Sequence, residues 1–105
     1  MIDNKISIIG TLYEKGEARF VGEKGTHRVQ QFVISFQNEF GPVQYRFMEA
    51  CKSAVDDLVM IKIGETIECK GVIKGKMRID VAKSESMWKR FNNLDEINEI
   101  RHIED

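Results

Sequence analysis

Four cations lie close together in the second half of the sequence. Lys70, Lys74, Lys76 and Arg78 fall within nine residues, and no acid lies between the first and the last of them. A run of positive charge without acids attracts phosphate groups, and a nucleic-acid backbone presents phosphates at regular intervals. We interpret this segment as a candidate phosphate-binding surface, with a merely solvated hairpin as the alternative.

Aromatic residues stand beside cations in three further places. Arg19, Phe20 and Arg28 flank a glycine-containing loop at residues 22–26, and Lys24 lies within this loop. The other two groups are Tyr45, Arg46 and Phe47, and Trp88, Lys89 and Arg90. Bases stack on exposed rings with about 1 to 3 kcal/mol per base, so rings next to cations are typical of single-strand binders. Core packing is the alternative for Phe47, and a lid over the fold is the alternative for Trp88.

Charge is distributed unevenly along the 105 residues, although the net charge is only -1. Residues 1–91 hold 15 Lys and Arg against 12 Asp and Glu, whereas residues 92–105 hold one arginine against five acids. The composition, 42% hydrophobic and 31% charged, is ordinary for one globular domain. We expect a mildly basic domain at 1–91 followed by an acidic tail at 92–105.

Several classes of protein are disfavoured by the sequence. Cys51 and Cys69 lack metal-ligand spacing, and His27 and His102 stand alone, so we expect reduced thiols, no metal and no cofactor. The sequence contains no nucleophile–base pair and no phosphate loop, which argues against an enzyme. No apolar run approaches the roughly 18 residues of a membrane helix. The first residues do not resemble a signal peptide, so we expect a cytoplasmic protein.

Short strand-like segments separated by glycine turns position these residues. The predicted strands are residues 5–13, 28–37, 43–50, 63–71 and 77–82, with a helix over 52–61. Phe32, Ile34 and Phe36 alternate and should face the core. This order predicts an all-β, five-stranded Greek-key OB-fold barrel with one short helix between its third and fourth strands.

The acidic tail carries its own pattern. Asn93 and Glu96 resemble a capping box, and apolar residues recur every three positions, at Leu94, Ile97, Ile100 and Ile103. This spacing predicts a short helix. The helix would pack on the barrel, join a dimer partner, or lay its acids across the cationic groove in competition with DNA.

Three stretches resemble a known family. IKIGETIECKGVIKGKMRID is similar to the fourth and fifth strands of bacterial and phage single-stranded-DNA-binding proteins, through Gly64, Glu65, Ile67, Gly71, Gly75, Lys76 and Arg78. QQFVISF and YRFMEACKSAVDDL resemble the second and third strands and the helix of these proteins, and also a bacterial OB-like domain family of unknown function. The resemblance covers residues 5–91. The glycine- and proline-rich linker of the bacterial housekeeping members has no counterpart here.

This resemblance implies sequence-tolerant binding of single-stranded DNA in replication, recombination or repair, by a bacterial or phage homodimer or higher homo-oligomer that contacts partner proteins through its tail. A protein-interaction module and an RNA binder are the alternatives. The candidate nucleic-acid-binding residues are Arg19, Phe20, Lys24, Arg28, Tyr45, Arg46, Phe47, Lys70, Lys74, Lys76, Arg78, Trp88, Lys89 and Arg90.

Overall fold

The computed structural model describes residues 5–37, 39, 41–74 and 94–104. Its elements are β1 (Lys5–Lys15), β2 (Arg19–Val21), β3 (His27–Gln37), β4 (Val43–Cys51), α1 (Ser53–Val59), β5 (Thr66–Val72) and β6 (Asp95–His102). Most of the described chain is therefore β structure, as the period-two sequence pattern predicts.

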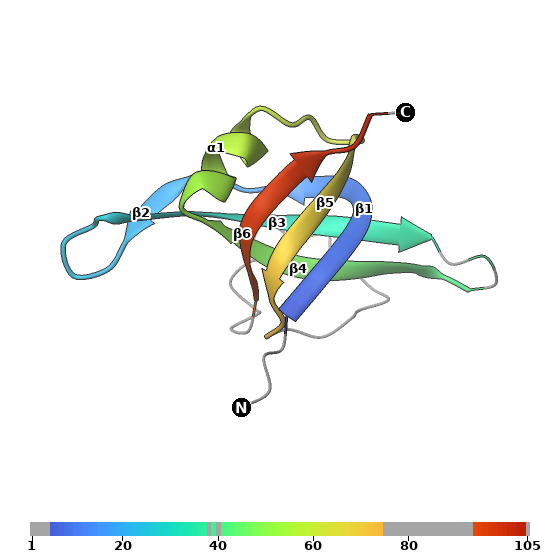
Figure 1. Cartoon of the computed structure of the whole chain (residues 1–105), viewed down its shortest axis with the longest axis horizontal. Helices are drawn as coiled ribbons and strands as arrows, with labels where there is room; N and C mark the ends of the chain where they lie inside the picture. The colour runs from blue at the N-terminus through green and yellow to red at the C-terminus, as the bar shows by residue number, and fades with distance from the viewer. Residues whose placement is uncertain (1–4, 38, 40, 75–93, 105) are drawn as a thin grey trace.

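Five of the six described strands pair in a closed ring. The order is β1–β5–β6–β4–β3, and β3 pairs back with β1. All neighbours are antiparallel except β4 and β6, which are parallel. The short strand β2 pairs with β3 outside the ring and forms with it a hairpin that projects from the barrel (Figure 1). This ring is the small barrel of an OB fold.

Strand β1 bends so that it can pair with two neighbours. Residues 5–11 pair with β5, whereas Thr11 to Lys15 pair with β3, and the second register shifts between Leu12 and Glu14. Gly10 lies at the bend, where a Cβ atom would come within 2.9 Å of the Ser35 carbonyl oxygen and of the Phe36 ring. Glycine lets the two strands approach at this point.

Alternate residues of β3 and β4 fill the barrel. Phe32 and Ile34 are fully buried together with Met48, which confirms their predicted place in the core, and Phe36 packs partly buried against them. Helix α1 adds Ala54, Val55 and Leu58 to the same core. Burial of these apolar side chains is the main stabilising contribution to such a small domain.

The two ends of α1 differ in how they are capped. Its N-cap residue is Lys52, with φ 56° and no side-chain capping bond. At the other end, the Lys15 ammonium of β1 donates hydrogen bonds to the carbonyl oxygens of Ile61 (2.6 Å) and Leu58 (3.2 Å). A cation suits this end of a helix because the last carbonyl groups lack partners and carry partial negative charge.

The predicted helix in the tail is wrong, because Asp95–His102 is strand β6. Its pairing with β5 shifts register: Lys70 lies opposite Glu99, and Gly71 opposite Ile97. Asn98 is the extra residue of a β-bulge, so Ile97 and Ile100 both reach the core although they are three positions apart. A bulged strand thus imitates the spacing of a helix.

Strand β6 occupies the place between β4 and β5 that closes the ring. The strand predicted at 77–82 lies outside the described residues. Gly71 is the point of closest approach to β6, since a Cβ atom there would overlap the carbonyl group of Glu96. Any larger residue at Gly71 would push the two strands apart.

Candidate nucleic-acid interface

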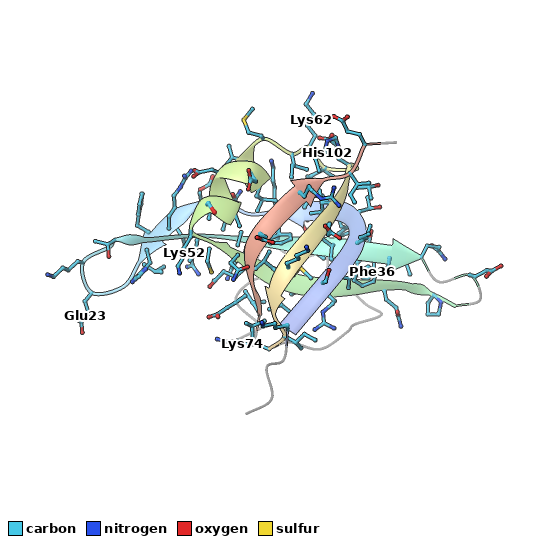
Figure 2. All side chains as sticks on the ribbon, in the orientation of Figure 1. Glu23, Phe36, Lys52, Lys62, Lys74 and His102 are labelled. Atoms are coloured by element: carbon cyan, nitrogen blue, oxygen red, sulfur yellow. The ribbon has the colours of Figure 1, made fainter. Side chains whose placement is uncertain are left out.

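The hairpin of β2 and β3, residues 19–29, is here named the arm. It carries Arg19, Phe20 and Lys24, all of which are exposed. The Phe20 ring is 66% exposed, although phenylalanine is usually buried. Glu23 marks the tip of the arm in Figure 2, away from the barrel core. Within the described part of the chain, neither Arg19 nor Lys24 forms an ion pair. The arm therefore presents the exposed aromatic ring of Phe20 between two cations, Arg19 and Lys24, that are available to bind phosphate.

Two other predicted cations are engaged by carboxylates. Arg28, the cross-strand neighbour of Phe20, pairs with Asp56 of α1. The Lys74 ammonium lies 2.8 Å from a carboxylate oxygen of Glu96, and this hydrogen bond raises the pKa of Lys74. Both side chains are partly accessible, so phosphate groups would compete with these carboxylates for them.

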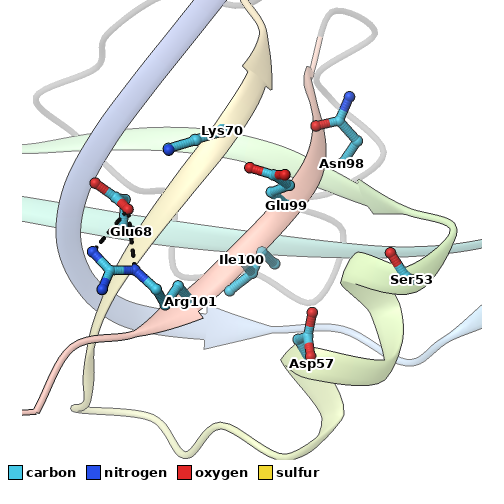
Figure 3. Close-up of a pocket in the computed structure, with 8 residues that line it drawn as sticks. All are labelled: Ser53, Asp57, Glu68, Lys70, Asn98, Glu99, Ile100 and Arg101. Atoms are coloured by element: carbon cyan, nitrogen blue, oxygen red, sulfur yellow. Dashed lines mark hydrogen bonds and ion pairs between the residues drawn. The ribbon is translucent and has the colours of Figure 1, made fainter.

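Lys70 lies in a groove of about 330 Å³ between α1 and the outer faces of β5 and β6 (Figure 3). Acids surround it there. Glu99 is its neighbour across the strands, and Glu68 is held by Arg101 at 3.1 Å. The mixed charge of this groove makes it a poor phosphate surface, and the structure does not bring Lys70 together with the arm.

Arg46 is not the exposed cation that the sequence pattern predicts. Its side chain is on the inner side of β4, and only 8% of the residue is exposed. Its guanidinium group forms an ion pair with the Asp95 carboxylate. Nε donates to Oδ2 at 2.6 Å and Nη2 to Oδ1 at 3.1 Å. The backbone N–H of Lys74 donates to the same carboxylate at 2.8 Å. Arg46 therefore ties together β4, the beginning of β6 and the chain just after β5.

Tyr45 and Phe47 lie on the opposite side of β4. Phe47 is 3% exposed and packs with Val33 and Leu94. Its ring is therefore part of the core and is not exposed for stacking, which is the alternative that the sequence analysis named. Tyr45 is half-buried against the same cluster and meets Tyr13 of β1 edge to face, with ring centroids 5.0 Å apart. Tyr13 is exposed, and its outward position follows from the alternation along β1; the sequence reasoning overlooked it.

The remaining candidates, Lys76, Arg78, Trp88, Lys89 and Arg90, lie outside the described residues. They belong to the segment that connects β5 to β6, whose two flanks meet at the Lys74–Asp95 hydrogen bond. In the described residues, no group of three or more His, Cys, Asp and Glu side chains is arranged to hold a metal ion. Nor does the described part contain a helix long and apolar enough to cross a membrane.

The strand ring, the helix between β4 and β5 and the projecting arm make up an OB fold, and solved structures of single-stranded-DNA-binding proteins share this fold. The SSB domain of a Synechococcus sp. protein superposes with a TM-score of 0.72 at 10% identity, over 97% of this chain and 98% of that one. Mitochondrial single-stranded DNA binding protein Rim1 from S. cerevisiae matches with a TM-score of 0.69 at 10% identity, over 100% and 98% of the two chains.

The dimeric N-terminal domain of PriB from Thermoanaerobacter tencongensis has a TM-score of 0.66 at 9% identity, over 97% of this chain and 98% of that one. At such identities the likeness establishes the fold. No protein-family model matches the sequence, and no curated protein matches it significantly.

Proposed function

We propose that this protein binds single-stranded DNA with little dependence on sequence. The observation that carries the proposal is the exposed ring of Phe20 between Arg19 and Lys24 on an arm that projects from an OB barrel. An exposed ring supplies a stacking surface for any base, worth about 1 to 3 kcal/mol, and the flanking cations neutralise phosphates.

The connection between β5 and β6 is proposed as the second contact. It contains Lys76, Arg78, Lys89 and Arg90, together with Trp88. In an OB fold the loop between the first two barrel strands and the loop between the last two border the binding face. Here the arm lies between β1 and β3, and the connection between β5 and β6 joins the last two strands of the described ring. We propose that a single strand passes from the arm to this connection.

We further propose a homodimer or larger homo-oligomer that acts in the cytoplasm during replication, recombination or repair. Two features of β1 support self-association. Residues 5–10 pair with β5 and, in the described part of the chain, with no strand on their other edge. Ile9 on the outer face of β1 is 54% exposed. An open strand edge beside an exposed aliphatic side chain favours pairing with another chain. Sedimentation of Ile9→Lys against the unmodified protein would test this contact.

Fluorescence anisotropy with labelled oligonucleotides of about thirty bases tests DNA binding. We expect the single strand to bind and the duplex of the same length to bind far more weakly, with affinity falling as salt rises. An oligoribonucleotide run in parallel distinguishes DNA from RNA as the preferred ligand. Absence of binding to every strand at low salt would refute the proposal.

A further inference from the structure

A second groove, of about 480 Å³, lies at the base of the arm. It is lined by the arm, by the end of β4 with the adjoining Lys52, and by the beginning of β6. Arg28, the cross-strand neighbour of Phe20, lies on its wall. Directly paired residues share a face of the sheet, so Phe20 and Arg28 lie on the face of the arm toward α1, whereas Val29, Cys51 and Glu49 lie on the other face. A strand stacked on Phe20 would have to cross the edge of the arm to reach this groove, which is here named the arm groove.

Two kinds of surface line the arm groove. Val21 and Val72 contribute apolar area suited to the face of a base. Lys52 is exposed at the rim and forms no ion pair within the described residues, so it is available for a phosphate. Both features fit one nucleotide of a bound strand.

The arm groove also contains carboxylates, which a simple phosphate-binding surface would not. Glu96 is held by Lys74. Glu49 is half-buried on the outer face of β4 and has neither a hydrogen bond nor an ion pair from its side chain within the described residues. Burial raises the pKa of the neighbouring Cys51 thiol, and the negative charges of Glu49 and Glu96 raise this pKa further.

We propose that the arm groove selects a base carrying an exocyclic amino group, with the Glu49 carboxylate as the acceptor. This inference rests on the proposed function. It adds a preference of the protein for certain bases, at the arm groove, to binding that otherwise depends little on sequence. Carboxylates accept hydrogen bonds from the amino group of cytosine, and adenine and guanine also carry amino groups. Thymine has the carbonyl oxygen O4 where cytosine has its amino group, and a carboxylate repels this oxygen. Binding to oligodeoxycytidine is therefore tighter than binding to oligothymidine.

The test compares these two oligonucleotides, of equal length and label, by anisotropy with the full chain at slightly alkaline pH, where the bases are uncharged. The expected preference for cytidine is about tenfold. Glu49→Met keeps the length of the side chain and removes the acceptor. It should reduce the preference to about one, mainly by weakening cytidine binding.

Glu99→Met is the matched control, since it makes the same change of charge on β6 outside the arm groove. It should change both affinities equally and leave their ratio intact. Circular dichroism checks the fold of each variant, and Glu49→Leu, which also removes the acceptor, serves if Glu49→Met does not fold.

Two results overturn the inference alone: equal binding of the two oligonucleotides, or a preference that survives in the Glu49 variants. A third result would also overturn it: if Glu49→Met strengthens both affinities equally, Glu49 merely repels DNA. If neither oligonucleotide binds, the proposed function fails and this inference fails with it.

Discussion

Arg46 and Asp95, 49 positions apart in the sequence, form a bidentate ion pair that is buried at the junction of β4 and β6. The Asp95 carboxylate also receives the backbone N–H of Lys74. One carboxylate thus fixes three segments, including both flanks of the connection that holds the remaining candidate binding residues. Because both side chains are buried, we expect the pair to position the proposed interface rather than to contact DNA.

Removing one partner of this pair should be costly. Asp95→Ala leaves the Arg46 charge buried without its counterion, and we expect a loss of about 3 to 5 kcal/mol in the free energy of unfolding, measured with urea. Arg101→Ala is the control, because it breaks the exposed pair with Glu68 and should cost at most about 1 kcal/mol. Equal losses in the two variants would contradict the structural role assigned to Arg46.

The sequence was informative where its pattern was local. The alternation of Phe32 and Ile34 predicted the core correctly because side chains in a regular strand have a period of two. Ile97 and Ile100 were misleading because the bulge at Asn98 adds a residue between them. The sequence does not show that Arg46 is buried, because its partner Asp95 comes from a distant segment. The alternation along β4 also leaves open which side of this strand faces the core.

Phe20 provides the most direct test of stacking. Phe20→Ala should lower the affinity for single-stranded DNA by about 5- to 150-fold, the equivalent of one stacked base. Stability should change little because the ring is mostly exposed. Phe20→Trp keeps an aromatic face and should retain binding. Anisotropy titrations measure the affinities and urea unfolding the stability; normal binding by Phe20→Ala would exclude the arm as the stacking site.

Glu96 should act as a competitor of DNA. It holds the Lys74 ammonium at 2.8 Å, and phosphate has to displace it. Glu96→Gln should therefore strengthen binding by about two- to fivefold at low salt, with a smaller gain at high salt. Lys74→Ala should weaken binding and make the log–log salt slope shallower by about 0.7. An unchanged slope for Lys74→Ala would mean that Lys74 does not reach a phosphate.

The buried thiol of Cys69 should make the free energy of unfolding depend on pH in the alkaline range. Burial, assisted by the charge of Glu68, raises the pKa of this thiol from 9.0 to about 12. Between these values the unfolded chain releases the proton and the folded protein keeps it, so stability is full below pH 9 and falls as the pH rises towards 12. The contribution of Cys69 to this slope is about 1.4 kcal/mol per pH unit.

Cys69→Ala isolates that contribution, because other groups titrate in the same range. The free energy of unfolding of the variant, measured by urea at several pH values, should decline less steeply above pH 9 than that of the unmodified protein. Parallel curves for the two proteins would show that Cys69 is as accessible to water in the folded state as in the unfolded chain.

The position of β6 also governs when the barrel can form during synthesis. Its parallel pairing joins Met48 to Asp95, and its antiparallel pairing joins Ile67 to His102. While a ribosome is still adding residues before 95, β4 and β5 lack the strand that separates them, and part of the core is open to water. The nascent chain therefore passes through an incomplete barrel with unpaired strand edges. The barrel can therefore close only after residues 95–102 have emerged from the ribosome.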